Sequence, residues 1–403
     1  MTRSPAAPGA GVPPHRALMP LLAVSAFAVA GTIHYQTPSL AAISAAFDAD
    51  AAAAGWVPTL SFAGLLAGNL FLVPLGDRLD KRRLILGELA VLVLALIAMA
   101  AAPSIAALAA ASFVVGVCSS LPQLFVPIVT ELAPPERRGR TVGTLLTALF
   151  VGILFARISG GLIAEHLGWR WNYVLSAAMV LALAPVLSAR LPPMPARSRL
   201  GYGTLMWSIA RLLAAHRQLQ RVAAIQFLLG LCYGGFWATV APMLAAFHHV
   251  GPLEAGLMGI PGAAGILVAR PAGRWMDRSG AGPVVATGVA IVCAGWTAFS
   301  FSALSILAVV AGAMLLDCGL RTAMVANQTL VNAAVPEARS RANTIFATHV
   351  WAGNASGALL ASGAFARFGW SAVCALALSA AALALLIQLC AARGTPTAPA
   401  PRR

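Results

Sequence analysis

The stretch that decides the fold occurs twice in the chain, as PLGDRLDK at residues 74–81 and as PAGRWMDR at residues 271–278. At an offset of 197 residues the proline, the glycine and the second aspartate of the first copy find matches, and a basic residue follows that aspartate in both copies. Residues 135–169 also align with residues 336–370 without a gap, at an offset of 201 residues and with eight of thirty-five positions identical. Similar segments at a long, nearly constant spacing indicate an internal duplication. The sequence therefore predicts two halves with the same orientation.

The composition places both halves in a membrane. Of 403 residues, 60% are hydrophobic and 10% are charged, and the mean hydropathy is +0.84, whereas a soluble domain carries about 25% charged residues. One span takes roughly 20 apolar residues, and twelve runs are long enough. They lie at 17–46, 56–75, 84–102, 104–132, 141–166, 169–190, 221–247, 252–272, 284–303, 306–335, 341–366 and 370–392. We expect an all-α integral membrane fold, with twelve transmembrane helices in two pseudo-symmetric six-helix bundles and no separate large soluble domain.

The charges and cysteines exclude other classes of protein. The six cysteines lie inside apolar runs without paired spacing, so neither a disulfide framework nor a metal site is expected. A net charge of +15 would favour a nucleic-acid partner in a soluble protein. Here, however, 22 of the 27 basic residues fall on one side of the membrane, two on the other and three within spans. By the positive-inside rule both termini are cytoplasmic, and we expect no nucleic-acid partner.

The same pattern divides the chain into five segments. The tails at 1–16 and 393–403 are rich in proline, alanine and arginine and are expected to be cytoplasmic and disordered. Six-helix bundles are expected at 17–190 and 221–392, joined by a cytoplasmic linker at 191–220 with an amphipathic helix. The first apolar run is expected to stay as a membrane anchor rather than be cleaved as a signal peptide. Two parallel halves of this kind place a substrate site between them near the bilayer midplane and predict alternating access.

These residues resemble the major facilitator superfamily over nearly the whole chain. The signature loop between spans two and three looks like residues 76–83, with a degenerate second copy at 273–280. The runs at 72–78, 161–171 and 317–319 are similar to bacterial drug and metabolite exporters of the proton-antiporter type. That resemblance implies proton-coupled efflux. The 26 arginines to one lysine, with abundant alanine, suggest a high-GC bacterium and hence its inner membrane.

Two positions depart from the antiporter pattern. Span five carries Ala156 and Arg157 where antiporters of the superfamily usually have a glycine-proline step. In span four, Ser112 stands where the family's intramembrane arginine would fall. Proton coupling would then have to run through Asp317, with His34 as a second candidate.

A cytoplasmic gate is expected at the two signature loops. Glycine allows a tight turn and a close helix approach. Asp80 can pair with nearby arginines or with a helix N-terminus in one conformer and release them in the other. The alternative is that the basic residues only determine topology. The candidate gate residues are Gly76, Asp77, Asp80, Arg83, Arg140, Gly273, Asp277 and Arg341.

Ionisable groups inside the spans are functional candidates because each costs several kcal/mol unless it is paired or faces water. Asp317 lies about 17 Å along its run, near the midplane, and Arg321 follows one turn later on the same face. Two interpretations stay open: a permanent ion pair that holds span ten, or a protonatable carboxylate that couples transport or contacts substrate. Arg157, in the outer half of span five, can bind an anionic substrate or a counter-carboxylate. Glu88 is expected to snorkel or pack near the cytoplasmic surface.

Polar and aromatic side chains interrupt the spans where a cavity would form. Any one of them is explained by hydrogen bonding between helices, which membrane bundles use widely. As a set they favour a cavity for an amphipathic organic solute rather than for an inorganic ion. They are His34, Tyr35, Gln36, Asn69, Gln123, Gln226, Tyr233, Trp237, Asn327, Gln328, His349 and Asn354.

The function expected is secondary active export of a small organic compound, driven by the proton gradient. Import of a metabolite by the same fold is the alternative. A non-transporting sensor would be expected to carry a soluble output domain, and a membrane-embedded enzyme such as a lipid transferase lacks a supporting His, Asp and Ser constellation. The glycine-rich runs lack the lysine and hydroxyl residues of a phosphate loop, so no nucleotide or other cofactor is expected. We expect a monomer whose partners are the substrate, protons and membrane lipid.

Overall fold

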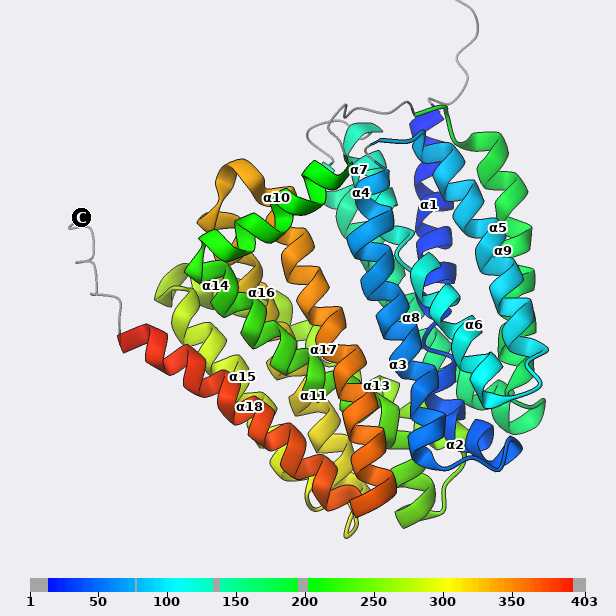
Figure 1. Ribbon diagram of the computed structural model, residues 1–403, viewed down its shortest axis with the longest axis vertical. Coiled ribbons are helices and arrows are strands. Elements are labelled where there is room, and N and C mark those ends of the chain that lie inside the picture. The colour runs from blue at the N-terminus through cyan, green and yellow to red at the C-terminus, as the bar shows by residue number, and fades with distance from the viewer. Residues whose placement is uncertain (1–13, 77, 133–137, 195–201, 394–403) are drawn as a thin grey trace, which may run out of the picture.

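The computed structural model describes residues 14–76, 78–132, 138–194 and 202–393, and the regular elements in these ranges are all helices (Figure 1). The tails predicted at 1–16 and 393–403 lie largely outside these ranges, and the gate candidate Asp77 lies wholly outside. The helices of the first half are α1 (Pro14–Gly31), α2 (Gln36–Ala46), α3 (Ala51–Ala67), the π-helix η1 (Gly68–Leu72), α4 (Val73–Leu75), α5 (Lys81–Ala100), α6 (Ile105–Cys118), α7 (Pro122–Leu132), α8 (Arg138–His166) and α9 (Arg170–Arg190).

The second half follows a linker helix. Its elements are α10 (Tyr202–Ala215), α11 (Arg217–His248), α12 (Pro252–Leu257), α13 (Gly259–Gly262), α14 (Gly265–Ser279), α15 (Ala281–Phe299), α16 (Ile306–Ala334), the short η3 (Pro336–Ala338), α17 (Arg339–Phe368) and α18 (Trp370–Arg393). The all-α prediction is thereby confirmed for the part of the chain that the structure describes.

Eleven helical segments in the described ranges are long and apolar enough to cross a membrane, and they coincide with all of the predicted runs except 341–366. That run forms α17, which has 30 residues but is too polar along its length to count as a span by composition. α17 packs against α3 of the first half and against α11 of its own half. Its polar residues are therefore shielded by protein rather than by lipid, as interior polar groups of a membrane bundle must be.

The first span is broken near its middle. Between α1 and α2 the backbone turns through hydrogen bonds from the Thr32 nitrogen to the Val29 oxygen and from the His34 nitrogen to the Gly31 oxygen. Gly31 sits at a close crossing with α8, because a Cβ placed there would lie 3.1 Å from the Cβ of Ala156. The break holds His34 in the interior, where only 4% of it is exposed.

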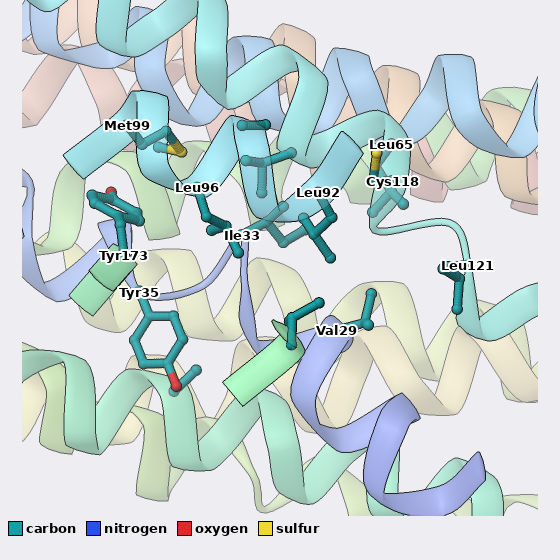
Figure 2. Close-up of a cluster of buried hydrophobic side chains, with 14 of the residues drawn as sticks. Val29, Ile33, Tyr35, Leu65, Leu92, Leu96, Met99, Cys118, Leu121 and Tyr173 are labelled. Atoms are coloured by element: carbon teal, nitrogen blue, oxygen red, sulfur yellow. The ribbon is translucent and has the colours of Figure 1, made fainter. Parts of the chain in front are cut away.

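Each half has its own hydrophobic core. Figure 2 shows Leu92 of α5 and Cys118 of α6 in the core of the first half. The core of the second half centres on Phe299, whose ring centroid lies 4.6 Å from that of Phe236 and 5.0 Å from that of Trp296. Aromatic pairs at these separations stabilise a core beyond the area they bury.

The linker helix α10 is amphipathic. Ile209 is buried, and Met206 and Leu212 pack beside it against a core formed by α11, α16 and α17. Trp207, on the other face, is 70% exposed. The Tyr202 hydroxyl donates a hydrogen bond of 3.0 Å to the Phe71 carbonyl. α10 therefore contacts both halves.

The two halves meet closely at one end of the molecule and diverge at the other (Figure 1). We call the meeting end, formed by the α2–α3, α8–α9, α11–α12 and α17–α18 turns, the distal end, and the end where α1 and α5 begin the proximal end. α17 packs on α3, α8 packs on α12, and α2 contacts both α11 and α12. A Cβ at Gly55 would overlap Ser362, and a Cβ at Gly256 would overlap the Arg157 carbonyl oxygen. Small residues thus let the halves close against each other at the distal end.

Candidate functional site

A cavity of about 20 Å³ lies between the halves and is lined by three of the charged residues that the sequence places inside the spans. Arg157 comes from α8, and Asp317 and Arg321 come from α16. Tyr233 of α11 completes its polar lining. Side chains far apart in the sequence thus meet where two duplicated halves are expected to hold a substrate.

Arg157 reaches from the first half into the second. One of its terminal nitrogens donates a hydrogen bond of 2.9 Å to the Tyr233 hydroxyl. Its guanidinium carbon lies 3.4 Å from the ring centre of Trp237, a cation–π contact. The residue is 4% exposed, and its Nε has no hydrogen-bond partner among the described residues. The structure thus buries a cation against rings and a hydroxyl.

Asp317 and Arg321 lie one turn apart on α16. The Asp317 Oδ2 is 3.7 Å from the Arg321 Nε, which is an ion pair but too long for a good hydrogen bond. The start of α14 also lies against the carboxyl group, at Gly265. A Cβ at Gly265 would overlap Asp317 and lie 2.7 Å from the Arg321 Cγ, so this approach requires glycine. Asp317 is thus held by one cation and by a helix N-terminus, which favours negative charge.

A second cavity, of about 410 Å³, adjoins the first and lies between α8, α14 and α16. Phe150, Ile266 and Arg321 line both cavities. The Arg321 guanidinium carbon lies 4.8 Å from the Phe150 ring centre. The remaining lining is mostly apolar and consists of Gly265, Met324, Val325, Gln328 and Thr329. Arg321 therefore stands at the junction of a small charged cavity and a larger apolar one.

Several of the predicted polar residues line neither cavity. Gln36 accepts a hydrogen bond of 3.2 Å from Ser61. Asn69, in the π-helix, donates to the Leu65 carbonyl at 2.9 Å. Gln123 is exposed. For Gln36 and Asn69 the structure shows the contacts within and between helices that were the alternative to a cavity lining.

Two predicted residues of α17 also lie elsewhere. His349 lines a different cavity, of about 430 Å³, with residues of α10, α11 and α18, and its Nδ1 lies 2.8 Å from the Ile345 carbonyl oxygen. Asn354 packs at the crossing of α17 with α11, where a Cβ on Gly230 would lie 3.2 Å from its amide oxygen. Gln328 lines the larger cavity and also donates to Asn343.

Four predicted residues are buried close to the interface of the halves or in their cores. His34 is buried in the break of the first span, and Tyr35 packs against α8, where a Cβ on Gly160 would lie 3.0 Å from its ring. Gln226 and Asn327 are at most 1% exposed, and none of their side-chain amide atoms has a partner among the described residues. Buried amides usually have hydrogen-bond partners. The amides of Gln226 and Asn327 therefore have hydrogen-bonding capacity that the described residues do not use.

The described gate candidates lie at the proximal end, and no ion pair joins any two of them. Asp80 caps α5 by accepting a hydrogen bond of 3.1 Å from the Arg83 backbone nitrogen. The remaining five are spread over the surface and the helix contacts. Gly76 packs beside Leu124, Arg341 is half-buried, Arg140 and Asp277 are exposed, and a Cβ at Gly273 would meet nothing.

Glu88 packs rather than snorkels. It is 5% exposed, and neither carboxyl oxygen has a partner among the described residues. Phe150 and Gly265 are site residues that the sequence analysis missed. Phe150 lies two helical turns before Arg157 and so on the same face of the helix, and Gly265 lies in a glycine-rich run. These positions in the sequence could have identified both residues.

Comparisons with known proteins agree with this architecture. A family model described as Major Facilitator Superfamily matches residues 22–215 and 222–403. The chain belongs to the Major Facilitator Superfamily. It is 31% identical over 373 residues to the uncharacterized transporter YgaY of Escherichia coli, covering 92% of this chain and 94% of YgaY. It is 33% identical over 379 residues to "Probable transporter SCO4007" of Streptomyces coelicolor, covering 93% of this chain and 87% of that protein.

A crystal structure of the nucleoside transporter NupG superposes with a TM-score of 0.78 at 13% sequence identity, covering 95% of this chain and all of NupG. At that identity the likeness shows the fold alone. Together the family and the relatives confirm the resemblance seen in the sequence. The chain is a multi-pass membrane transporter of the secondary type and not an enzyme.

Proposed function

We propose that this transporter exports a small organic solute across a bacterial inner membrane in exchange for protons, with both termini in the cytoplasm. In this proposal the bundles at 17–190 and 221–392 rock about the cavity between them, and Asp80 and Asp277 take part in the proximal gate. The protein works as a monomer surrounded by lipid.

The observation that carries the proposal is the placement of Asp317. It is the acidic residue that lines the cavity between the halves, it is 4% exposed, and its ion-pair partner Arg321 is 3.7 Å away. A carboxyl group at such a position exchanges its loose partner for a proton at a modest cost, because the pair gives up no short hydrogen bond. Secondary transporters place coupling groups at the interface between their repeats.

The closed distal end supports alternating access. Glycine-mediated contacts hold α8 on α12 and place α3 against α17 at that end, whereas the proximal gate candidates carry no ion pair among the described residues. A solute would then enter from the proximal side, which the positive-inside rule makes cytoplasmic. Loading from the cytoplasm is the first step of export.

The test is growth protection in a host that lacks its main exporters. Wild type, Asp317→Asn and Asp48→Asn are expressed at matched membrane levels and challenged with a broad panel of toxic compounds. Asp48→Asn is the matched control, because Asp48 is an exposed turn residue with a positive φ that asparagine tolerates. We expect wild type and the control to protect against at least one compound and Asp317→Asn to lose that protection.

Proton exchange is measured with the same compound in everted membrane vesicles. We expect its addition to dissipate an imposed pH gradient in wild-type vesicles and not in Asp317→Asn vesicles. Sensitisation by the wild type would instead indicate import, and no effect on any compound would count against export. Protection that leaves the pH gradient untouched would overturn proton coupling.

A further inference from the structure

The cavity between the halves carries more positive than negative charge. Its lining holds two arginines, Arg157 and Arg321, and one acid, Asp317. We infer that the solute is an organic anion, whose acid group binds beside Arg157 and Arg321 and whose apolar body occupies the adjoining cavity. This inference rests on the proposed transport function, since it assigns the substrate class to the same site.

Arg157 is the residue that lacks a counter-charge. No carboxylate among the described residues lies within 4.0 Å of it, and its direct partners are the Tyr233 hydroxyl and the Trp237 ring. A charge taken out of water is costly unless another charge or several hydrogen bonds replace the water. Because Arg157 is 4% exposed and its Nε is unpartnered, the site is satisfied when an anion arrives.

Asp317 does not fill that role in this conformer. Its carboxylate is paired with Arg321 and lies against Gly265 at the start of α14, so its charge is already matched within the second half. The 3.7 Å separation leaves the Arg321 Nε without a hydrogen-bond partner. Both arginines therefore present a donor that a carboxylate, with its two oxygens, is shaped to accept.

The two cavities together describe an amphipathic shape. The charged cavity, of about 20 Å³, holds little more than one water molecule, whereas its neighbour, of about 410 Å³, has a mostly apolar wall. Arg321 and Phe150 belong to both cavities. A solute that fits both cavities has an acid group next to the arginines and, directly attached to it, a ring or alkyl body that packs against Phe150.

The test is direct binding to the purified full-length protein in detergent, with no gradient imposed. The probes are 3-phenylpropionate, 3-phenylpropan-1-ol and 3-phenylpropan-1-amine, which share one body and differ in head-group charge, together with a longer and a shorter acid and their alcohols. Isothermal titration gives each Kd. We expect an acid of the series to bind at least about tenfold more tightly than its alcohol, because charge-assisted hydrogen bonds are roughly twice as strong as neutral ones.

Substitutions then assign the preference to the cavity. Arg157→Gln and Arg321→Gln are each expected to weaken acid binding much more than alcohol binding and so to remove the preference for the acid, and Arg157→Lys, which keeps the charge, is expected to restore part of it. Arg270→Gln is the matched control, because Arg270 is an exposed arginine of α14 that lines neither cavity. Alcohol binding and the thermal unfolding midpoint show whether each variant is folded.

The inference is overturned if no acid binds more tightly than its alcohol, if the amine binds best, or if Arg157→Gln binds the acid as wild type does. Its failure is distinct from failure of the proposed function. Arginine-dependent binding of an acid without proton exchange or protection would uphold the substrate class and refute coupled export. Coupled export of a neutral or cationic compound would uphold the proposed transport function and refute the substrate class.

Discussion

Gly256 offers a direct test of whether the distal contact between the halves opens during the working cycle. It lies in α12, and a Cβ at this position would overlap the carbonyl oxygen of Arg157 and lie 3.3 Å from its carbonyl carbon. The obstacle is helix backbone of α8, which cannot swing aside as a flexible side chain can. Gly256→Ala therefore forces α8 and α12 apart and penalises the conformer in which they touch.

The size of the effect follows from the overlap. Overpacking a close contact by one methyl group costs about 1–3 kcal/mol. Alanine also favours the helix by about 1 kcal/mol over glycine, but that gain applies in both conformers and cancels from the equilibrium between them. At about 2 kcal/mol the ratio of distal-closed to distal-open protein falls roughly 30-fold.

The assay is a spin-label distance across the distal end. Labels are placed at Ala46→Cys and Ala246→Cys, two exposed positions near the distal ends of α2 and α11, in a background where the six native cysteines are replaced. We expect pulsed electron paramagnetic resonance to show mainly the short distance in the parent and a substantial longer distance in Gly256→Ala. The control is Gly363→Ala on α17, where a Cβ meets nothing within 4 Å. An unchanged distance distribution in Gly256→Ala would refute the reasoning.

Three further substitutions test contacts in and between the halves. Asn172→Ala removes a buried amide that donates to Ser39 at 3.1 Å and to the Gly160 carbonyl at 3.0 Å; it should lower the free energy of unfolding by about 1–3 kcal/mol, and a stable variant in detergent denaturation would count against this network. Glu88→Gln breaks no contact, since both buried carboxyl oxygens are unpartnered, and it removes a group that can carry an unpaired charge, so it should not lower the free energy of unfolding; a loss of about 1 kcal/mol or more would reveal a partner. Glu165→Gln weakens a hydrogen bond of 3.0 Å to the backbone at the start of α12 and should open the distal end by about 0.3–1 kcal/mol in the spin-label assay, less than Gly256→Ala; a shift toward the closed form would contradict this.

The sequence predicts the fold well because membrane insertion makes hydropathy a direct readout of helix position. Eleven predicted runs reappear as candidate spans. The exception, α17, shows where the argument weakens: a helix packed between protein surfaces need not be apolar all round. The break at 32–35 coincides with the polar residues that interrupt the first run, whereas the break at 119–121 could not be located from hydropathy, because the fourth run stays apolar on both sides of it.

The site is predicted in part. One cavity is lined by Asp317, Arg321, Arg157 and Tyr233. The three charged residues were predictable because a charge inside a span is costly unless it faces the bundle interior or water. The positions of the neutral polar residues are predicted less well, because Gln123 is exposed and His349 lines a separate cavity. A neutral amide or imidazole can hydrogen-bond to backbone anywhere along its helix, so it need not face a cavity. The rotation of each helix is determined by tertiary packing that a single sequence does not display.

The central claim is that the cavity of Arg157, Asp317 and Arg321 binds the solute and carries the coupling proton. Its most direct test uses proteoliposomes that hold a pH-sensitive dye, with the solute found by the growth panel added to wild type and to Asp317→Asn. The account predicts solute-dependent proton movement in the wild type, and in Asp317→Asn solute exchange between equal concentrations without proton movement. Proton movement in Asp317→Asn equal to that of the wild type would contradict it.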